Sequence, residues 1–432
     1  MIVNCISSTE MVTSFAMYFY SNIMGLTMAQ ISTIMLIGGV ADAISDPLTG
    51  IFVDKTNSRW GKARPYLLLF AIPLAITCYA VFKVPGMDAS GKYIYALITY
   101  VLYTLAYTMV VIPQNCLIPA LTDDMKDRLD VNMCGTVGTN IGQLIASGLG
   151  LTLVAVFGAG SEATGFSRTI LLFATIGALF VLMDFKNTNE RINPPKEQKA
   201  SLGDIIKSMK NLPWFLCTCV SLLSIAAIVV RASQAVYFAN YVLEAPAMAS
   251  QLLAISSFIG IPLALVTPFL ASKLGKRNLV LIGGIMGVAG NIGIYMFMHS
   301  WFMVMFWSVV LSLGVGVITG IIYVISAESI DYGEWKMGIR IQGFLMAFVG
   351  FTVKIANSLC NMMTSLILDK GGYDSTVAAQ SESAINAIQF NYLVLPSILF
   401  GLIILCMFFY TLDKKYPAIR EELEERRAKS AK

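Results

Sequence analysis

The chain has 432 residues, of which 56% are hydrophobic and only 13% charged, with a formal net charge of +4. A soluble domain carries about 25% charged residues, so a soluble fold is excluded and an integral membrane protein is expected. The single histidine, His299, excludes chemistry that needs clustered histidines. None of the eight cysteines forms a CxxC pair, so they are expected to be small core residues.

Continuous apolar runs of about 20 residues are long enough to cross a bilayer as helices. Transmembrane β-strands would be about 10 residues long and alternate in polarity, which these runs do not. The chain reaches its first run without a basic leader, so no cleaved signal peptide is expected. Twelve spans are predicted, at residues 2–22, 31–53, 65–84, 93–117, 132–157, 168–185, 212–239, 249–272, 279–298, 302–326, 343–367 and 391–411.

The lysine and arginine residues are concentrated in alternate connections. Counted from the first span, the even loops and the C-terminal tail hold 24 of them and the odd loops hold four. Cytoplasmic loops are enriched in these residues. Both termini are therefore expected in the cytoplasm, in a multi-pass protein of the plasma (inner) membrane.

The longest polar connection separates six spans from six. It contains Asn193-Pro194-Pro195-Lys196, a composition typical of a linker. The predicted organisation is an N-terminal half at residues 1–185, a linker at 186–211, a C-terminal half at 212–411 and a cytoplasmic tail at 412–432. In the tail, Glu422 and Arg426 have the spacing of an ion pair on a solvated helix.

The two halves repeat each other weakly. Residues 50–65, after the second span, read GIFVDKTNSRWGKARP, and residues 268–277, after the eighth, read PFLASKLGKR. Both are short basic turns with a glycine, at the same place in their six-helix half. They resemble the conserved loop motif of the major facilitator superfamily. Repeated halves are typical of transporters, whose substrate site lies between them.

Three further motifs stand in order along the chain: DAISDP at residues 42–47, LTDDMKDR at 121–128 and DYGEWKMGIR at 331–340. With the basic turn they resemble the glycoside–pentoside–hexuronide:cation symporter family, which includes melibiose and glucuronide permeases. The resemblance covers essentially the whole chain. It implies an all-α, twelve-helix membrane fold and uptake by alternating access. It also implies no enzymatic activity and no cofactor beyond a coupling ion, Na⁺ or H⁺.

Asp42 and Asp46 lie four residues apart, on one face of the second span. Two close carboxylates cannot both stay ionised cheaply unless a proton or a cation sits with them. Alternatively, both face water at a helix end and only stabilise the fold. The resemblance implies a cation site made by Asp42, Ser45, Asp46 and Thr108. Melibiose permease has an asparagine where Ser45 stands, which leaves Na⁺, Li⁺ and H⁺ open.

Three other ionisable residues lie deep in spans, where each costs at least about 2.5–3.5 kcal/mol. Lys354 matches a family lysine that lines the site between the halves, and it could also be a counter-ion of the acid pair. Arg231 suits a carboxylate or sulfonate in bidentate geometry, but it could also gate or extend to the interface. Glu10 could bond sugar hydroxyls or pair with either cation.

The acids and the arginine that bind the sugar in melibiose permease correspond here to Ile6, Val111 and Thr136. The site therefore lacks two acids and is expected to favour an anionic sugar such as a glucuronide. Four polar residues are further substrate-binding candidates, although packing would also explain them: Thr13, Gln114, Asn115 and Asn140.

Charged residues of the cytoplasmic loops are candidates for a gate. Exposed pairs contribute only about 0–1 kcal/mol each, so a network is needed to hold one state of the carrier. The alternative is a solvated surface. The candidates are Asp54, Arg59, Arg64, Asp124, Arg128, Asp331, Glu334 and Arg340.

The expected partners are a small glycoside or uronide and the lipid bilayer, without nucleic acid, and the chain is expected to be a monomer. The main alternative is a carrier of the same fold for lysolipids or other amphiphiles, which a lateral opening to the bilayer would indicate. A sensor would need an appended signalling domain, and a membrane enzyme would need a catalytic constellation. No nucleotide-binding P-loop is present, so transport is expected to be secondary.

Overall fold

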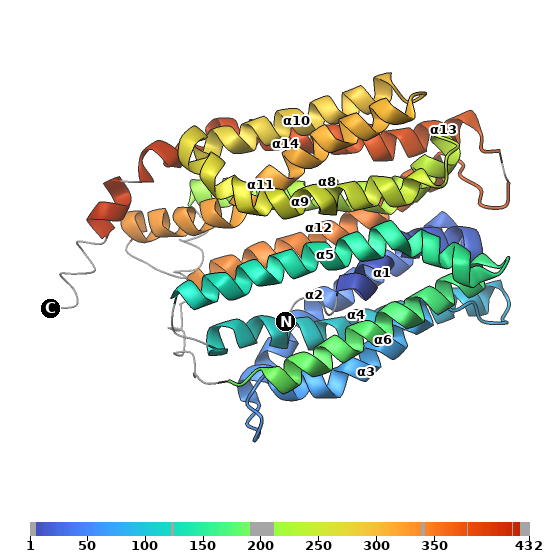
Figure 1. Cartoon of the computed structure of the whole chain (residues 1–432), viewed down its shortest axis with the longest axis horizontal. Coiled ribbons are helices and arrows are strands. Elements are labelled where there is room, and N and C mark those ends of the chain that lie inside the picture. The colour runs from blue at the N-terminus through green and yellow to red at the C-terminus, as the bar shows by residue number, and fades with distance from the viewer. Residues whose placement is uncertain are drawn as a thin grey trace. The chain divides into compact units, whose positions relative to one another are not determined.

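The computed structural model describes residues 6–121, 125–190, 211–337, 342–377, 379–416 and 418–423. Within these ranges the chain is helical, apart from turns and an isolated bridge between Ser58 and Gly61 (Figure 1). The helices in the first part of the chain are α1 (Ile6–Tyr18), η1 (Phe19–Ile23), α2 (Met28–Lys55), α3 (Arg64–Val81), α4 (Ala89–Leu121), α5 (Met125–Gly158) and α6 (Glu162–Asn187). The later helices are α8 (Leu212–Tyr237), η2 (Phe238–Val242), α9 (Met248–Leu274), α10 (Lys276–Met296), α11 (Trp301–Met337), α12 (Gln342–Lys370), α13 (Glu382–Gln389), η3 (Phe390–Val394), α14 (Leu395–Phe409) and η4 (Leu412–Lys414).

Each of the twelve predicted spans coincides with one helix or with consecutive helices. In the described part of the chain, ten helices are long and apolar enough to cross a membrane, and Met248–Leu263 of α9 is a shorter apolar stretch. The all-helical membrane fold is therefore confirmed, and the count of twelve crossings stays a prediction.

Several helices run further than the apolar runs indicate. The expectation that the gate candidates lie in loops is therefore wrong for most of them. A helix can continue beyond the membrane surface, because its backbone hydrogen bonds persist there and water solvates the polar side chains. Those within helices are Asp331 and Glu334 in α11, Asp54 in α2, Arg64 in α3 and Arg128 in α5.

Contacts between Cα atoms divide the chain into two compact units. The first comprises the described parts of residues 1–195, 229–261 and 357–392, and the second those of 196–228, 262–356 and 393–432. The predicted halves at 1–185 and 212–411 are a different division and stay a prediction.

In the first unit, α3 packs on α4 and α6, and α1 packs on α5 and α6 (Figure 1). Four phenylalanines form the contact between α1, α3 and α6, with ring centroids 5.1–6.2 Å apart: Phe15, Phe19, Phe82 and Phe166. Aromatic rings at this spacing stabilise a core beyond the area they bury. This core fixes α1 beside α3 and α6.

In the second unit, α10 packs closely on α11 and α14 through glycines. A Cβ added to Gly283 would lie 2.8 Å from the carbonyl oxygen of Gly314, and one added to Gly314 would lie 2.5 Å from that of Gly283. The ring of Phe400 lies directly against Gly287. Small residues allow helices in a membrane to approach this closely.

α1 and α8 end in the same way, each in a π-helical turn. The amide of Met24 donates to the carbonyl of Phe19 over 2.9 Å, and that of Leu243 donates to Phe238 over 3.0 Å. Such turns occur frequently at functional sites. The weak sequence repeat therefore has a structural counterpart at the ends of these two helices.

Candidate functional site

A polar cluster joins α2 and α4 near the middle of both helices. The hydroxyl of Thr108, which is fully buried, donates to a carboxylate oxygen of Asp42 over 2.7 Å. The Ser45 hydroxyl lies 3.0 Å from the backbone carbonyl oxygen of Asp42 and 3.2 Å from the Thr108 hydroxyl. Three residues predicted for the cation site are thus together. They offer the kind of oxygen that hard cations accept as ligands.

Asp46, the fourth predicted ligand, is half-buried one turn further along α2. Pro47 follows it inside the helix. Because proline has no N–H, it cannot make the helix bond to the carbonyl of Ala43. This carbonyl oxygen belongs to the same turn as Asp42 and Ser45. The cation role of the cluster stays a prediction.

Tyr100 of α4, which no sequence motif indicated, lies beside this cluster. Its ring packs against Gly38, one turn before Asp42, where an added Cβ would lie 2.3 Å from the tyrosine Cε1. The tyrosines of α4 follow one another closely in sequence, so no local pattern distinguishes this one.

Arg231 of α8 is held by Tyr392 of η3. One guanidinium nitrogen donates to the tyrosine hydroxyl over 3.0 Å and the other to the tyrosine carbonyl over 3.4 Å. The guanidinium carbon lies 4.3 Å from the ring centre, and Phe238 stacks on the same ring. Hydrogen bonds and a cation–π contact therefore fix the guanidinium. Tyr392 was missed because its role depends on a contact between distant segments.

Two amide candidates contact other helices. Gln114 donates to the buried carboxylate of Asp184 over 3.0 Å and so links α4 to α6. Asn140 of α5 lies against α9, where a Cβ added to Gly260 would be 3.3 Å from its amide oxygen. These contacts agree with the packing alternative for both residues, and their substrate role stays a prediction.

The substrate role of the remaining candidates stays a prediction. The side chain of Glu10 lies outside the described part of the structure. Asn115 is exposed, Thr13 is half-buried on α1, and Lys354 is half-buried on α12 in the second unit.

A second polar cluster gathers where α1 and α8 end. Asn22 donates to the Tyr241 hydroxyl over 2.8 Å and accepts from the Tyr373 hydroxyl over 2.9 Å. The Ser21 and Tyr237 hydroxyls lie 2.7 Å apart. Burial and the neighbouring phenols raise the pKa of Tyr373, so it remains a protonated donor. We call these five residues the tyrosine cluster. It was missed because each member is an ordinary polar residue at a span end.

A carboxylate anchors the basic turn between α2 and α3. Glu190, just after α6, accepts the backbone N–H groups of Lys62, Ala63 and Arg64 at 2.8, 2.8 and 3.1 Å. Ala63, the N-cap of α3, has no side chain that could accept them, so Glu190 caps the helix from outside. The Arg64 guanidinium donates to the Phe185 carbonyl over 2.7 Å, which ties the turn to α6.

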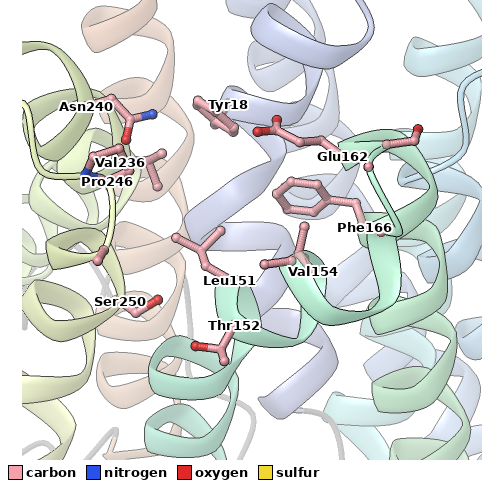
Figure 2. A pocket seen from close by; sticks show the side chains of 15 residues that line it. Tyr18, Leu151, Thr152, Val154, Glu162, Phe166, Val236, Asn240, Pro246 and Ser250 are labelled. Atoms are coloured by element: carbon pink, nitrogen blue, oxygen red, sulfur yellow. The ribbon is translucent and has the colours of Figure 1, made fainter.

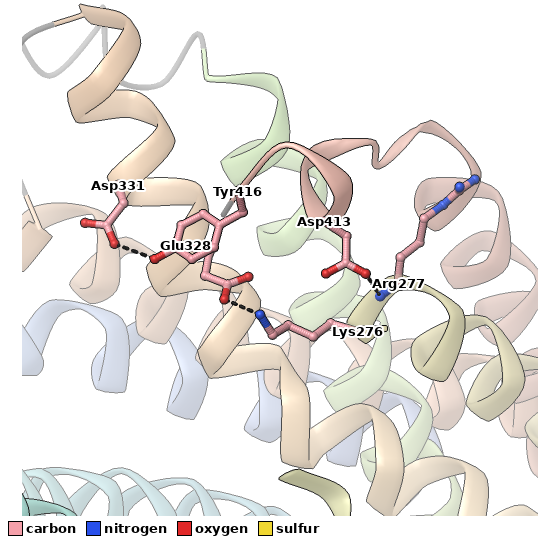
Figure 3. A network of polar contacts seen from close by, with 6 residues as sticks. All are labelled: Lys276, Arg277, Glu328, Asp331, Asp413 and Tyr416. Atoms are coloured by element: carbon pink, nitrogen blue, oxygen red, sulfur yellow. Dashed lines mark hydrogen bonds and ion pairs between the residues drawn. The ribbon is translucent and has the colours of Figure 1, made fainter. Parts of the chain in front are cut away.

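The second basic turn is anchored in the same way. A carboxylate oxygen of Asp413, just after α14, accepts the backbone N–H of Arg277 over 3.3 Å (Figure 3). The Arg277 guanidinium donates to the carbonyls of Met407 and Phe408 over 2.9 and 3.0 Å. Each basic turn is therefore held by an acid that follows the last helix of its half.

Both anchors require a glycine in the turn. Gly61 has φ +103° and Gly275 has φ +79°, a conformation that side chains rarely adopt. An added Cβ would lie 2.4 Å from the Glu190 carboxyl carbon and 2.9 Å from an Asp413 carboxylate oxygen. The paired turns are visible in the sequence, and so is an acid after the last helix that anchors each turn, Glu190 and Asp413.

The end of α11, which carries the DYGEW motif, contacts the C-terminal tail. Tyr416 donates to the Asp331 carboxylate over 2.9 Å (Figure 3), and Trp335 donates to Glu422 over 2.7 Å. Lys276 forms an ion pair with Glu328 of α11. Glu422 therefore bonds a tryptophan, while its predicted partner Arg426 lies outside the described residues.

The gate candidates Arg59 and Arg64 make contacts inside the first unit, and Asp331 makes a contact inside the second. Arg64 bonds α6, Arg59 lies 4.4 Å over the ring of Trp60, and Asp331 bonds the tail. Glu334 is half-buried in α11. A gate between the halves stays a prediction. Outside the described part of the structure lie the side chains of Asp54 and Arg128 and the residues Asp124 and Arg340.

Replacing Glu190 by Ala is expected to destabilise the protein by about 1–2 kcal/mol, the usual effect of losing a helix cap. Three backbone N–H groups lose their common acceptor. Thermal unfolding of the purified protein should show a lower midpoint. Lys62→Ala, a change of an exposed side chain in the same turn, is the control. An unchanged midpoint for Glu190→Ala would show that the anchor does not stabilise the fold.

Comparisons with known proteins agree with this architecture. The family described as MFS/sugar transport protein matches residues 3–414. The chain is 33% identical to an isoprimeverose transporter of Lactiplantibacillus pentosus, over 98% of this chain and 89% of that protein. It is 28% identical to a glucuronide carrier protein homolog of Escherichia coli strain K12, over 96% of this chain and 91% of that protein.

Among solved structures, a bacterial homolog of the human lysosomal transporter Spinster, in an inward-facing and occupied conformation, has the same fold. The TM-score is 0.69 over 96% of this chain and 94% of that chain, with 15% sequence identity.

Proposed function

Because the chain belongs to the MFS/sugar transport protein family, it is a membrane transporter, and we propose that it is a symporter of a glycoside or hexuronide. Uptake is driven by Na⁺ or H⁺ through alternating access. The observation that supports this proposal is the cluster of Asp42, Ser45 and Thr108 between α2 and α4. A half-buried carboxylate beside hydroxyl and carbonyl oxygens is suited to a small cation or a proton.

The coupling follows from the free energy of buried charge. Asp42 and Asp46 lie one turn apart on α2, and two close carboxylates in a poorly solvated place cannot both stay ionised cheaply. The ion removes that cost and prepares the neighbouring sugar site. Because coupling between two ligands is reciprocal, the sugar must raise the affinity for the ion by the same factor.

The substrate class that we favour is an anionic sugar such as a glucuronide. Arg231 supports this proposal because its guanidinium is held in a fixed orientation by Tyr392. Lys354 adds a second cation at a position that the family resemblance assigns to the site. The relatives carry different substrates by name, isoprimeverose and a glucuronide, so they do not decide between sugars.

Uptake of a panel of labelled glycosides and uronides tests the function. Cells or vesicles that contain the protein are compared with and without an imposed Na⁺ or proton gradient. We expect at least one member of the panel to accumulate above its external concentration only when one of the gradients is present. Accumulation that is independent of both gradients would contradict symport.

The chain is proposed to lie in the plasma (inner) membrane with both termini in the cytoplasm, as the distribution of lysine and arginine indicates. The tyrosine cluster then lies on the outer side. Its hydrogen bonds join η1 to α8 and η2 and to the segment that follows α12. They must break before the carrier opens outward.

Tyr373→Phe is expected to favour outward opening. Each neutral hydrogen bond contributes about 0.5–1.5 kcal/mol, so the open population should rise severalfold. A cysteine placed at Met17, which is 2% exposed on α1 below the cluster, reports opening through its rate of labelling by an impermeant maleimide. Tyr295→Phe, an exposed tyrosine on α10, is the control. Equal labelling rates with and without Tyr373→Phe would contradict the closing role.

A further inference from the structure

A cavity of about 640 Å³ lies in the first unit, between α5, α6 and the segment from η2 to the start of α9 (Figure 2). Most of its walls are apolar, with Leu151, Val154, Phe166, Val236 and Pro246 among the lining side chains. Its volume falls in the range of small-molecule sites. The proposed ion site uses none of these residues.

Among the described residues, none of the proposed sugar-binding residues lines the cavity either. Arg231 and Val236 both lie on α8, and five residues correspond to about 140° around a helix. Arg231 packs on Tyr392, while Val236 lines the cavity. The two side chains therefore project from different faces of α8.

The cavity borders the lipid-facing surface of α5. Thr152, one of its lining residues, shares a helix face with Leu149 and Val156, which are 51% and 67% exposed. On α9, which lines the cavity through Ser250, Phe258 is 66% exposed. Large apolar side chains this exposed on membrane-spanning helices face lipid, so an occupant can enter from the bilayer.

The only charged side chain that lines the cavity in the described residues, Glu162, lies at one end of it with two other polar groups. Tyr18, Glu162 and Asn240 lie at the end where α5 connects to α6, and Thr152 and Ser250 lie further along the helices (Figure 2). Glu162 is exposed and begins α6, whose N-cap is Ser161. This end therefore offers one carboxylate and an amide to a group that carries N–H donors, and it disfavours an anionic group.

We propose that this cavity binds the acyl chain of a membrane phospholipid whose head group bears a primary ammonium. The chain lies between α5 and α9 against Leu151 and Val154, and the ammonium donates to Glu162. A phosphatidylethanolamine has this chemistry. A phosphatidylcholine has the charge without the N–H donors, and a phosphatidylglycerol has a net negative charge.

Native mass spectrometry of the purified, delipidated protein tests this site directly, and it does not depend on transport. The full-length protein is titrated with phosphatidylethanolamine, phosphatidylcholine and phosphatidylglycerol of identical acyl chains. We expect one tight site. The ethanolamine lipid should bind about threefold to fivefold more tightly than the others, the usual size for a solvent-exposed ion pair with a hydrogen bond, which the other head groups cannot form with Glu162. Equal affinities, or tighter binding of the glycerol lipid, would overturn the proposal.

Two variants with matched controls locate the site. Glu162→Gln should bring the ethanolamine lipid to the affinity of the choline lipid. Glu382→Gln, which changes the acid after the Ser381 cap of α13, should leave the preference unchanged.

Ala155→Trp should fill the cavity and remove the tight site, while Val156→Trp on the adjacent lipid-facing position should retain it. Retention of the preference in Glu162→Gln, or of the tight site in Ala155→Trp, would overturn the assignment.

Discussion

Replacing Asp42 by Asn is expected to abolish uphill accumulation of the substrate while some facilitated exchange remains. The amide cannot carry the charge that a cation neutralises, and the hydrogen bond from Thr108 loses its charged acceptor. A hydrogen bond to a charged group contributes about 1.5–3 kcal/mol, so affinity for the ion should fall at least tenfold. Gradient-driven uptake and exchange at equal concentrations, measured in the same vesicles, separate the two activities.

The same outcome is expected for Asp46→Asn. Thr108→Ser, which keeps the hydroxyl, should retain more coupling than Thr108→Val, which removes it. Asp88→Asn, a change of an exposed acid before α4, is the control and should behave like the unaltered protein. Full accumulation by Asp42→Asn would exclude this carboxylate from the coupling site.

Replacing Arg231 by Gln is expected to reduce transport of an anionic sugar at least tenfold and to affect its neutral counterpart much less. A guanidinium donates charge-assisted hydrogen bonds to a carboxylate, and the neutral sugar lacks that acceptor. Competition between a glucuronide and the corresponding neutral glycoside, measured for both proteins, gives the selectivity ratio.

Tyr392→Phe provides a graded comparison for Arg231. It removes the hydroxyl that accepts a hydrogen bond at 3.0 Å but keeps the ring beneath the guanidinium. We expect the selectivity of Tyr392→Phe for the glucuronide over the neutral glycoside to lie between that of the unaltered protein and that of Arg231→Gln. Arg168→Gln, an exposed arginine on α6, should have no effect. Equal inhibition by the glucuronide and the neutral glycoside in the unaltered protein would count against an anionic substrate.

The positions of the membrane helices were determined by the sequence alone. A run of about 20 apolar residues must form a helix in a bilayer, since every backbone polar group needs a partner within its own segment. The rule is local, so all twelve predicted spans coincide with helices. Their polar extensions were missed, as at the end of α11, because hydropathy does not mark where a solvated helix stops.

The acid pair on α2 was also evident from the sequence, because helical periodicity alone places Asp42 and Asp46 on one face. The inclusion of Thr108 came from the family resemblance. Only the tertiary structure placed its hydroxyl 2.7 Å from Asp42, since α4 must pack on α2 for the two groups to meet.

The contacts that join distant segments were decided by the tertiary structure. Glu190 caps α3 across 127 residues of chain, and Tyr392 holds Arg231 across 161. No local pattern encodes such a pair, because the partner of a polar group depends on which helix faces lie against each other. That choice follows from packing, as at the phenylalanine core around Phe166 and the glycine contact of α10 with α11.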